Sequence, residues 1–327
     1  MNDLERSLAY KPTRSELAYV RRMPARKLPR FSVIIPSLNQ GRYLPETIES
    51  IRAQEYPRAD ILVVDGGSTD GTVDVLRKYR KQSGGKLKFI SEKDRGQYEA
   101  VNKGIDATDG EIVAWINSDD VYLPGAFWKV ATFFTFNHCA MVVYGRNWYT
   151  DPDLNPRFEY PTDWSPVLSE QRRRMLHFCL PPQPSLFFRR AAPMLAGLLS
   201  SEILDYELWL RWQRAFQFFF LDDFLSMSRL HAGAKTMTNR KKLILEIVDV
   251  VHRYYLTVPR SWAIALSYER RHGTAWTTGA SAPIDARLKL ESMLWWGYLN
   301  LAKGPRAVAS ILRGGTQLLA ESMLGKK

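Results

Sequence analysis

The stretch 31–71, FSVIIPSLNQGRYLPETIESIRAQEYPRADILVVDGGSTDG, decides the fold of this chain. Its first residues, FSVIIP, form a short β-branched run, which predicts a buried strand that stops at Pro36. Residues 43–54 predict a helix, because Pro45 lies near the first turn and apolar residues recur on one face. Residues 61–65 predict a second buried strand, which a polar, glycine-rich turn follows.

The same alternation continues beyond this stretch. Residues 72–79 and 99–108 predict helices, and 86–92 and 111–120 predict strands, with Asp70 placed to cap the first of these helices. Strands that alternate with helices at this spacing predict a mainly parallel α/β sheet, in which ligands bind at the carboxyl ends of the strands. Polar side chains gather at those ends: Ser37, Asn39, Asp65, Asp94, Asp119 and Asp120.

Composition excludes several classes of protein. The chain has 327 residues, of which 45% are hydrophobic and 24% charged, so it is neither a disordered polyelectrolyte, a collagen nor a disulfide-stabilised miniprotein. No apolar run reaches 18 residues, and the first residues lack the apolar core of a signal peptide, so we expect neither a spanning helix nor a secretory signal. We expect Cys139 and Cys179 to be reduced structural thiols in a cytoplasmic protein.

The net charge of +12 lies at the two ends of the chain. Residues 1–30 carry +5, residues 239–327 carry +8, and the part between them is close to neutral. We therefore expect a basic N-terminal extension over 1–30, a central domain over 31–236 and a basic helical region over 237–327. Within the helical region, 239–256, 284–302 and 305–324 predict helices.

Two motifs at strand ends could bind a charged ligand. The paired carboxylates of NSDD (117–120) suit a hard cation such as Mg²⁺, although a solvated turn is the alternative. In VDGGSTDG (64–71), Asp65 could accept hydrogen bonds from a base or sugar, and the glycines allow close approach of the backbone. An ordinary glycine turn explains the second motif equally well.

Later residues add four candidates. Asp205 and Glu207 precede an apolar helix, so one carboxylate could act as a general base, although the helix macrodipole also favours acids there. His231 could bind a metal or phosphate, or be structural. Gln183 lies in a proline-bracketed loop that could line an acceptor site or simply be a rigid connection. No hydrolase triad, zinc motif, Walker loop or dinucleotide fingerprint accompanies them.

The order of these pieces resembles glycosyltransferase family 2. SVIIPSLNQGRYLPETIESIRAQEYP, ILVVDGGSTDGT, ISEKDRGQYEAVNKG and GEIVAWINSDD carry the resemblance over about 31–125, and it extends more weakly to RLHAGAKT (229–236). The resemblance implies a GT-A fold over 31–236, with a nucleotide-sugar half (31–125) and an acceptor half (126–236). It also implies an inverting transferase that uses a nucleotide-diphosphate sugar and Mg²⁺ or Mn²⁺.

The resemblance also implies roles for individual residues. Asp205 matches the catalytic base, Asp119 the metal-binding end of an Asp-x-Asp motif, and His231 a metal or diphosphate contact. Gln183 and Glu207 would lie near the acceptor. The nucleotide-sugar contacts would be Pro36, Ser37, Asn39, Asp65, Asp94, Arg95, Gln97, Asn102 and Asn117. The chain departs from the family at Gly66 and Asn117, where an aspartate is frequent.

Partners follow less directly from the sequence. The substrates implied are a nucleotide sugar and a saccharide or lipid-linked acceptor, with polysaccharide or glycolipid synthesis as the setting. Leu294, Trp295, Trp296 and Tyr298 beside Lys289 and Lys303 fit an interfacial helix on the inner face of the plasma membrane, or a helix packed on protein. Acidic strand ends argue against nucleic-acid binding. A homo-oligomer and a catalytically silent nucleotide-sugar-binding scaffold remain open.

Overall fold

The chain divides into two compact units. The computed structural model describes residues 9–162, 168–200, 204–234, 238, 240–255, 258–272 and 286–301. Unit 1 comprises Met1–Met175 and Cys179–His231, and unit 2 comprises Leu176–Phe178 and Ala232–Lys327. The division after His231 lies close to the predicted start of the basic helical region at residue 237.

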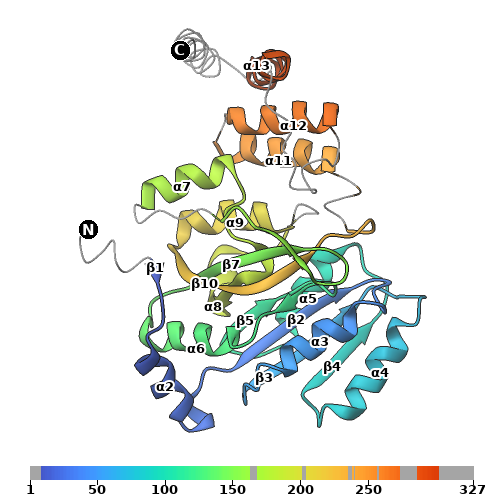
Figure 1. Ribbon diagram of the computed structural model, residues 1–327, viewed down its shortest axis with the longest axis vertical. Coiled ribbons are helices and arrows are strands. Elements are labelled where there is room, and N and C mark those ends of the chain that lie inside the picture. The colour runs from blue at the N-terminus through green and yellow to red at the C-terminus, as the bar shows by residue number, and fades with distance from the viewer. Residues whose placement is uncertain are drawn as a thin grey trace. The chain divides into compact units, whose positions relative to one another are not determined.

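The described residues of unit 1 form one sheet of ten strands (Figure 1). The strand order is β1-β10-β7-β9-β5-β2-β3-β4, with β6 beside β10 and β8 beside β7. β5, β2, β3 and β4 are mutually parallel, as the alternation predicts, whereas β9 runs antiparallel between β5 and β7. The strands are β1 (Ala9–Tyr10), β2 (Phe31–Ser37), β3 (Ala59–Asp65), β4 (Leu87–Ser91), β5 (Ile112–Trp115), β6 (Val121–Tyr122), β7 (Val142–Thr150), β8 (Pro156–Glu159), β9 (Leu186–Arg189) and β10 (Phe218–Arg229).

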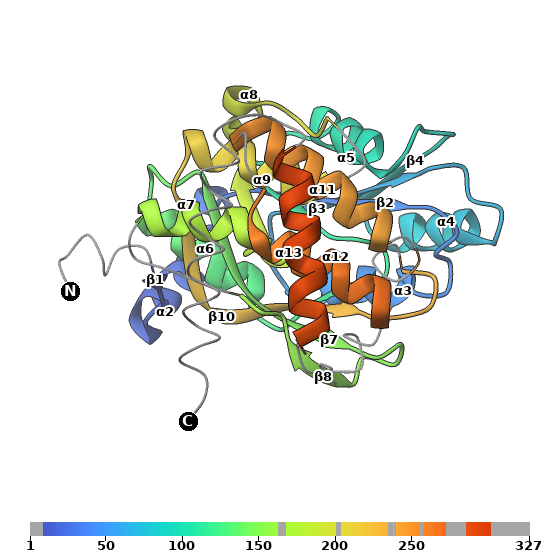
Figure 2. The ribbon, with the colours of Figure 1, turned by 90° about the horizontal axis from the view of Figure 1, so that it is seen from above.

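Helices cover both faces of this sheet, and α3 and α5 lie on opposite sides of β2 (Figure 2). Alternate residues of β2 face opposite ways, so Val33 packs with α3 while Ile34 lies under α5. A Cβ on Gly104 of α5 would come within 2.4 Å of Ile34 Cγ2, so the close approach of α5 requires glycine. The helices are α2 (Arg14–Arg22), α3 (Leu44–Arg52), α4 (Thr72–Gln82), α5 (Gln97–Asp106), α6 (Ala126–Phe136), α7 (Leu168–His177), α8 (Ala191–Ala196) and α9 (Leu204–Ala215), with 3₁₀ turns at Ala25–Lys27 and Gln183–Ser185.

Pro36 ends the contact between the central strands β2 and β5. The last hydrogen bond between them runs from Ile116 N–H to the Ile34 carbonyl, at 3.1 Å. The next bond of a parallel ladder would need an N–H at residue 36, which proline lacks. On its other side β2 stays paired with β3 as far as Ser37 and Asp65. The two central strands therefore part at their carboxyl ends, where the order of the sheet reverses.

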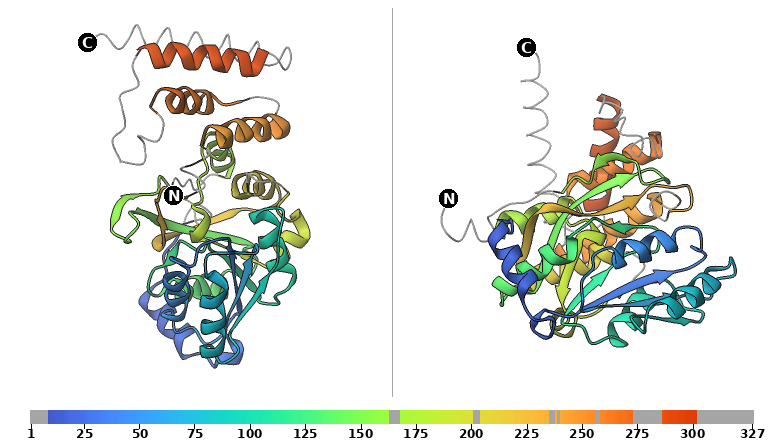
Figure 3. Two further views of the ribbon diagram at one scale, coloured as in Figure 1. Left: turned by 90° about the vertical axis from the view of Figure 1, so that its right-hand side faces the viewer. Right: turned by 60° about the horizontal axis from the view of Figure 1, so that its bottom comes forward.

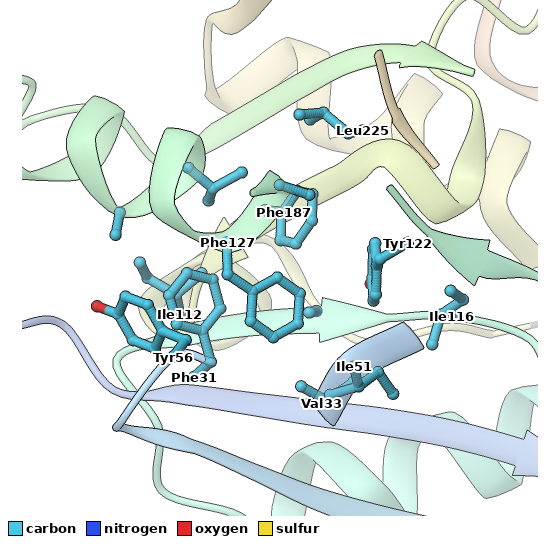
Figure 4. Close-up of a cluster of buried hydrophobic side chains, with 14 of the residues drawn as sticks. Phe31, Val33, Ile51, Tyr56, Ile112, Ile116, Tyr122, Phe127, Phe187 and Leu225 are labelled. Carbon is cyan, nitrogen blue, oxygen red and sulfur yellow. The ribbon is translucent and has the colours of Figure 1, made fainter. Parts of the chain in front are cut away.

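Aromatic rings fill the core between the sheet and helices α3 and α6 (Figure 4). The rings of Phe31 and Phe127 are stacked, with centroids 4.8 Å apart, and Tyr56 and Phe187 meet them edge-on. All four side chains are buried. Such rings bury large apolar areas, which stabilises the fold, and offset or edge-to-face ring pairs stabilise it further. This core fixes the base of the sheet from which the strand-end loops project.

Residues 9–30 are part of unit 1 rather than a separate extension. α2 begins with a capping box, in which Thr13 and Glu16 satisfy each other's backbone N–H groups. Val20 and Leu28 are buried in the main core, and β1 pairs in parallel with β10. The predicted boundary at residue 30 therefore does not separate two compact parts of the chain.

Unit 2 contains three described helices, α11 (Arg240–Tyr255), α12 (Arg260–His272) and α13 (Ala286–Leu301). α12 packs against both α11 and α13, and the three form successive layers (Figure 3). Trp296 is buried and its indole donates to the Val258 carbonyl at 2.9 Å. Within the described ranges, no helix combines the length and apolar character needed to cross a bilayer. The helix predicted over 305–324 lies outside the described residues.

We predict that Val20→Ala lowers the free energy of unfolding by about 1–3 kcal/mol, because it removes buried methyl groups from the core. The measurement is a urea unfolding curve. Arg22→Ala, which changes an exposed residue of the same helix, is the control and is expected to unfold close to the wild type. An unchanged midpoint for Val20→Ala would show that α2 lies outside the cooperative unit.

Candidate active site

The loops after β2 and β3 are tied together. Asn39 has a left-handed backbone (φ 54°), and its side-chain oxygen accepts from Thr69 N–H at 2.9 Å. Asn39 N–H donates to Ser68 Oγ at 2.7 Å. Pro36 and Ser37 end β2 and are buried, and Ser37 Oγ has no hydrogen-bond partner among the described residues. The first predicted nucleotide contacts thus border the point where β2 and β5 part.

Asp65 is fully buried at the end of β3. Its carboxylate accepts from the N–H groups of Gly67 and Ser68, at 3.2 and 3.0 Å, and from Ser91 Oγ at 2.7 Å. Ser68 Oγ also donates to it. These bonds hold the glycine-rich turn in place. The predicted contact between Asp65 and a base stays a prediction.

The loop after β4 brings Asp94 against Gly66. A Cβ at residue 66 would lie 3.0 Å from Asp94 Oδ2, so the glycine leaves the space that this carboxylate uses. Burial raises the pKa of Asp94 above its ordinary value, and Glu99 adds to the rise. Arg95 is mostly exposed and pairs with Glu99 at 3.1 Å. The two charged loop residues are therefore in different environments, one partly buried and one open to solvent.

Asn117 bridges two other site residues. Gln97 Nε2 donates to Asn117 Oδ1 at 2.6 Å, and Asn117 Nδ2 donates to Asp120 Oδ2 at 3.3 Å. Asp120 also accepts from Arg229 N–H at 3.0 Å. Burial, and then the charge of Asp119, raises the pKa of Asp120 well above its ordinary value. An amide at 117 can donate to this buried carboxyl, whereas an aspartate would repel it.

Asp119 and His231 meet across the site. His231 Nε2 lies 2.9 Å from Asp119 Oδ2, and both side chains are largely shielded from solvent. The described residues include no group of three or more His, Cys, Asp or Glu side chains that could hold a metal. Mg²⁺ and Mn²⁺ usually take few protein ligands and complete their shell with substrate phosphates and water. A carboxylate with an imidazole therefore fits a cation that also binds a diphosphate.

Gln183 lies at the end of β5. Its Nε2 donates to the Trp115 carbonyl at 2.6 Å, two residues before Asn117. Its Oε1 is buried and has no hydrogen-bond partner within the described residues. A buried acceptor without a donor is costly, so this oxygen suits a ligand hydroxyl or a water molecule. The predicted acceptor role stays a prediction that this geometry favours.

Asp205 lies in the first turn of α9, near Tyr160 and Cys179. Tyr206 N–H donates to Asp205 Oδ1 at 2.9 Å. Burial chiefly raises the pKa of the Cys179 thiol and of the Tyr160 hydroxyl, and the charge of Asp205 raises both further. The carboxylate is half-buried, as a proton acceptor beside a bound substrate would be.

Glu207, through Arg211, and Asn102 contribute to holding the backbone of residues 198–199. Glu207 is 2% exposed and binds Arg211 at 3.0 Å, while Arg211 also donates to the Leu198 carbonyl at 2.7 Å. Asn102 forms two bonds with the backbone of Leu199, at 2.8 and 3.1 Å. Both side chains thus contribute to the architecture around Asp205. The predicted contacts of Glu207 with acceptor and of Asn102 with donor stay untested.

Residues 32–191 match the family model described as Glycosyl transferase family 2. These residues form a family 2 glycosyltransferase domain. An uncharacterized glycosyltransferase of Nostoc is 31% identical over 185 residues, covering 55% of this chain and 56% of the relative. A PGL/p-HBAD biosynthesis glycosyltransferase of Mycobacterium tuberculosis is 35% identical over 118 residues, covering 36% of this chain and 46% of the relative. The chain thus spans about half the length of these curated relatives.

Solved structures confirm the predicted GT-A fold. TarS residues 1–349 of S. aureus, in complex with UDP-GlcNAc, align with a TM-score of 0.55 at 20% identity, over 86% of this chain and 83% of TarS. A mannosyltransferase of Pyrobaculum calidifontis, in complex with GDP-Man and Mn²⁺, aligns with a TM-score of 0.57 at 16% identity. The alignment covers 93% of this chain and 86% of the mannosyltransferase. At these identities the likeness concerns the fold alone.

Three residues of the candidate site were not found by sequence reasoning. Thr47 Oγ1 donates to the Ser118 and Asp120 carbonyls, at 3.0 and 2.8 Å, and so holds the backbone on both sides of Asp119. Arg229 binds Asp120 through its backbone, and Tyr43 contacts the His231 ring. A threonine on the apolar face of the helix predicted over 43–54 was a usable signal for the first. No local sequence pattern indicated the roles of Arg229 and Tyr43, because the residues that they contact are distant in sequence.

We predict that Glu207→Ala lowers the free energy of unfolding by about 3–5 kcal/mol, because it leaves a mostly buried Arg211 without its carboxylate. Glu170→Ala is the matched control, since Glu170 pairs with Arg173 and Arg174 at the surface and its loss is expected to cost no more than about 1 kcal/mol. Urea unfolding measures both. Normal stability of Glu207→Ala with a raised KM for acceptor would favour the acceptor role instead.

Proposed function

We propose that this protein is an inverting, metal-dependent glycosyltransferase. It would move a sugar from a nucleotide-diphosphate sugar to an acceptor hydroxyl in polysaccharide or glycolipid synthesis. The observation that carries the proposal is the Asp119–His231 pair, which lies at strand ends within a family 2 fold. The names of the mycobacterial relatives and the nucleotide sugars bound by the two structural neighbours support the same reaction class.

The donor would bind where β2 and β5 part. Pro36, Ser37 and Asn39 would border the nucleoside, and Asp65, Asp94, Arg95, Gln97, Asn102 and Asn117 would complete the donor side. Asp119 and His231 would hold Mg²⁺ or Mn²⁺. When bound, the cation would offset the negative charge that develops on the leaving diphosphate. Because Asp120 is engaged by Arg229 and Asn117, Asp119 is the carboxylate available to it.

Asp205 would act as the general base. It would accept the proton of the acceptor hydroxyl while that oxygen attacks the anomeric carbon. The bond from this carbon to the diphosphate oxygen breaks, and its electron pair leaves with the nucleoside diphosphate, so attack in line gives inversion. Gln183 would receive a hydrogen bond from a sugar hydroxyl through its unpartnered Oε1.

The location and assembly of the protein are further proposals. Leu290 and Leu294 of α13 are 60% and 68% exposed, which supports a peripheral contact with the inner face of a membrane. Buried Trp296 instead supports packing within unit 2, so the aromatic residues do not all belong to one interfacial face. The side chain of Tyr298 and the whole of Lys303 lie outside the described residues. Cytoplasmic placement and a homo-oligomer remain predictions.

A catalytically silent scaffold is the second candidate, and Asn117 motivates it. The first position of the Asp-x-Asp motif carries an amide that is engaged by Gln97 and Asp120. Such a protein would bind nucleotide sugars without cleaving them.

We predict that one nucleotide sugar among UDP-, GDP- and dTDP-linked donors releases its nucleotide with Mn²⁺ or Mg²⁺, and that EDTA abolishes this release. Asp119→Ala is expected to lose the metal dependence together with the activity. Donor binding without release in the presence of varied acceptors would favour the silent scaffold. An undiminished rate in EDTA would contradict metal dependence.

We predict that Asp205→Asn lowers kcat by roughly 10²–10⁴-fold, the usual contribution of one positioned base, while the KM for donor changes little. Steady-state kinetics with a transferring acceptor give both values. Asp153→Asn alters an exposed aspartate and is the matched control. Full turnover by Asp205→Asn would remove this residue from the mechanism.

A further inference from the structure

The ring of Tyr43 is surrounded by three basic side chains. The Arg229 guanidinium lies 4.4 Å from the ring centroid, and that of Arg42 lies 5.1 Å away. The His231 ring lies 4.8 Å from it, at an interplanar angle of 43°. Tyr43 is 9% exposed and directly precedes α3. Cations within about 6 Å of an aromatic face are attracted by its quadrupole, and more strongly when shielded from water.

Arg229 connects three parts of the site. Its backbone N–H binds Asp120, while its guanidinium lies on Tyr43 and forms an ion pair with Glu46 of α3. The side chain is 1% exposed, and its Nε has no hydrogen-bond partner in the described part of the chain. A buried guanidinium is costly, and both Glu46 and the Tyr43 ring help to compensate that cost.

The same ring lies beside His231. β10 ends at Arg229, and Leu230 N–H then donates to the Thr150 carbonyl at 2.9 Å, which holds the backbone one residue before His231. The imidazole itself contacts Asp119 through Nε2 and Tyr43 through its ring. The direction in which His231 presents Nε2 therefore depends on where Tyr43 lies.

We propose that Tyr43 and Arg229 form a clasp that positions His231 and Asp119 to bind the cation and diphosphate. They are positioning residues, because they act through His231 and Asp120. This inference rests on the proposed function. It assigns to the turn before α3 the role of positioning the residues that would hold the cation. The strand-end carboxylates and the proposed base have other roles.

The test measures metal affinity directly. Mn²⁺ would be titrated into the full chain, alone and with UDP or GDP, and free Mn²⁺ followed by electron paramagnetic resonance. Tyr43→Leu is expected to weaken Mn²⁺ binding by about 10- to 100-fold, the usual effect of losing a group that orients a metal ligand. Tyr43→Phe keeps the aromatic ring and is expected to bind Mn²⁺ with wild-type affinity.

Phe89→Leu is the matched control, because it removes a cation–π contact with Arg80, at 5.0 Å, on the edge strand β4. It is expected to leave Mn²⁺ affinity unchanged. Arg229→Lys keeps the charge but loses the contact of a planar guanidinium with the Tyr43 ring. It is expected to weaken Mn²⁺ binding, as Tyr43→Leu does. If Tyr43→Leu does not fold, this second variant provides the same comparison.

Three results would overturn the inference. The first is wild-type affinity in folded Tyr43→Leu or Arg229→Lys. The second is an equal loss in Phe89→Leu, which would trace the effect to general destabilisation. The third is a wild type that binds no Mn²⁺ with or without nucleotide, which would overturn the proposed metal-dependent function as well. Only the first two leave that function standing.

Discussion

The missing N–H of Pro36 is the constraint on which the site depends. A central strand normally stays paired on both sides along its length, but β2 loses β5 after Ile34 and keeps β3. The chain after β5 is then free to turn over α3, where Thr47 binds its carbonyls. A crevice at the point where strand order reverses is the usual ligand position in open α/β sheets. One imino acid thus ends the pairing of the two strands beside the carboxylates of the site.

The second half of the domain also contacts these strand ends. β10 is parallel to β7 and reaches the site with its final residue, Arg229, whose backbone binds Asp120. Gln183 binds the Trp115 carbonyl at the end of β5, and Asn102 binds the Leu199 carbonyl. Residues 31–125 therefore cannot form the Asp119–His231 contact alone, because His231 follows β10.

Local patterns in the sequence predicted the first half of the fold well. Short apolar runs predicted β2, β3 and β4, and apolar faces predicted α3, α4 and α5, because the burial of these elements is recorded in local sequence patterns. Asp70 does bind Thr72 N–H, although Gly71 is the N-cap of α4. α2 was missed, since it buries little more than Val20, yet its Thr13-x-x-Glu16 capping box was readable. β10 was missed because two aspartates interrupt its apolar residues.

The candidate site was less predictable from local spacing. Asp119 and His231 are 112 residues apart, so only the family resemblance brought them together. Glu207 was predicted to lie near the acceptor; its ion-pair partner Arg211 lies one turn later, a spacing that the sequence does show. The roles of Asn102 and Tyr43 depend on contacts between elements that no local pattern records.

The pairing of β1 with β10 has a consequence for synthesis of the chain. Ala9 lies opposite Phe220, so the earliest of the ten described strands to be synthesised pairs with the last of them. At 5–20 residues per second, the N-terminal strand waits roughly 10–40 seconds for its partner. During this time its hydrogen-bonding edge is exposed to other nascent chains. Addition of β1 to the edge of the sheet is thus a late event.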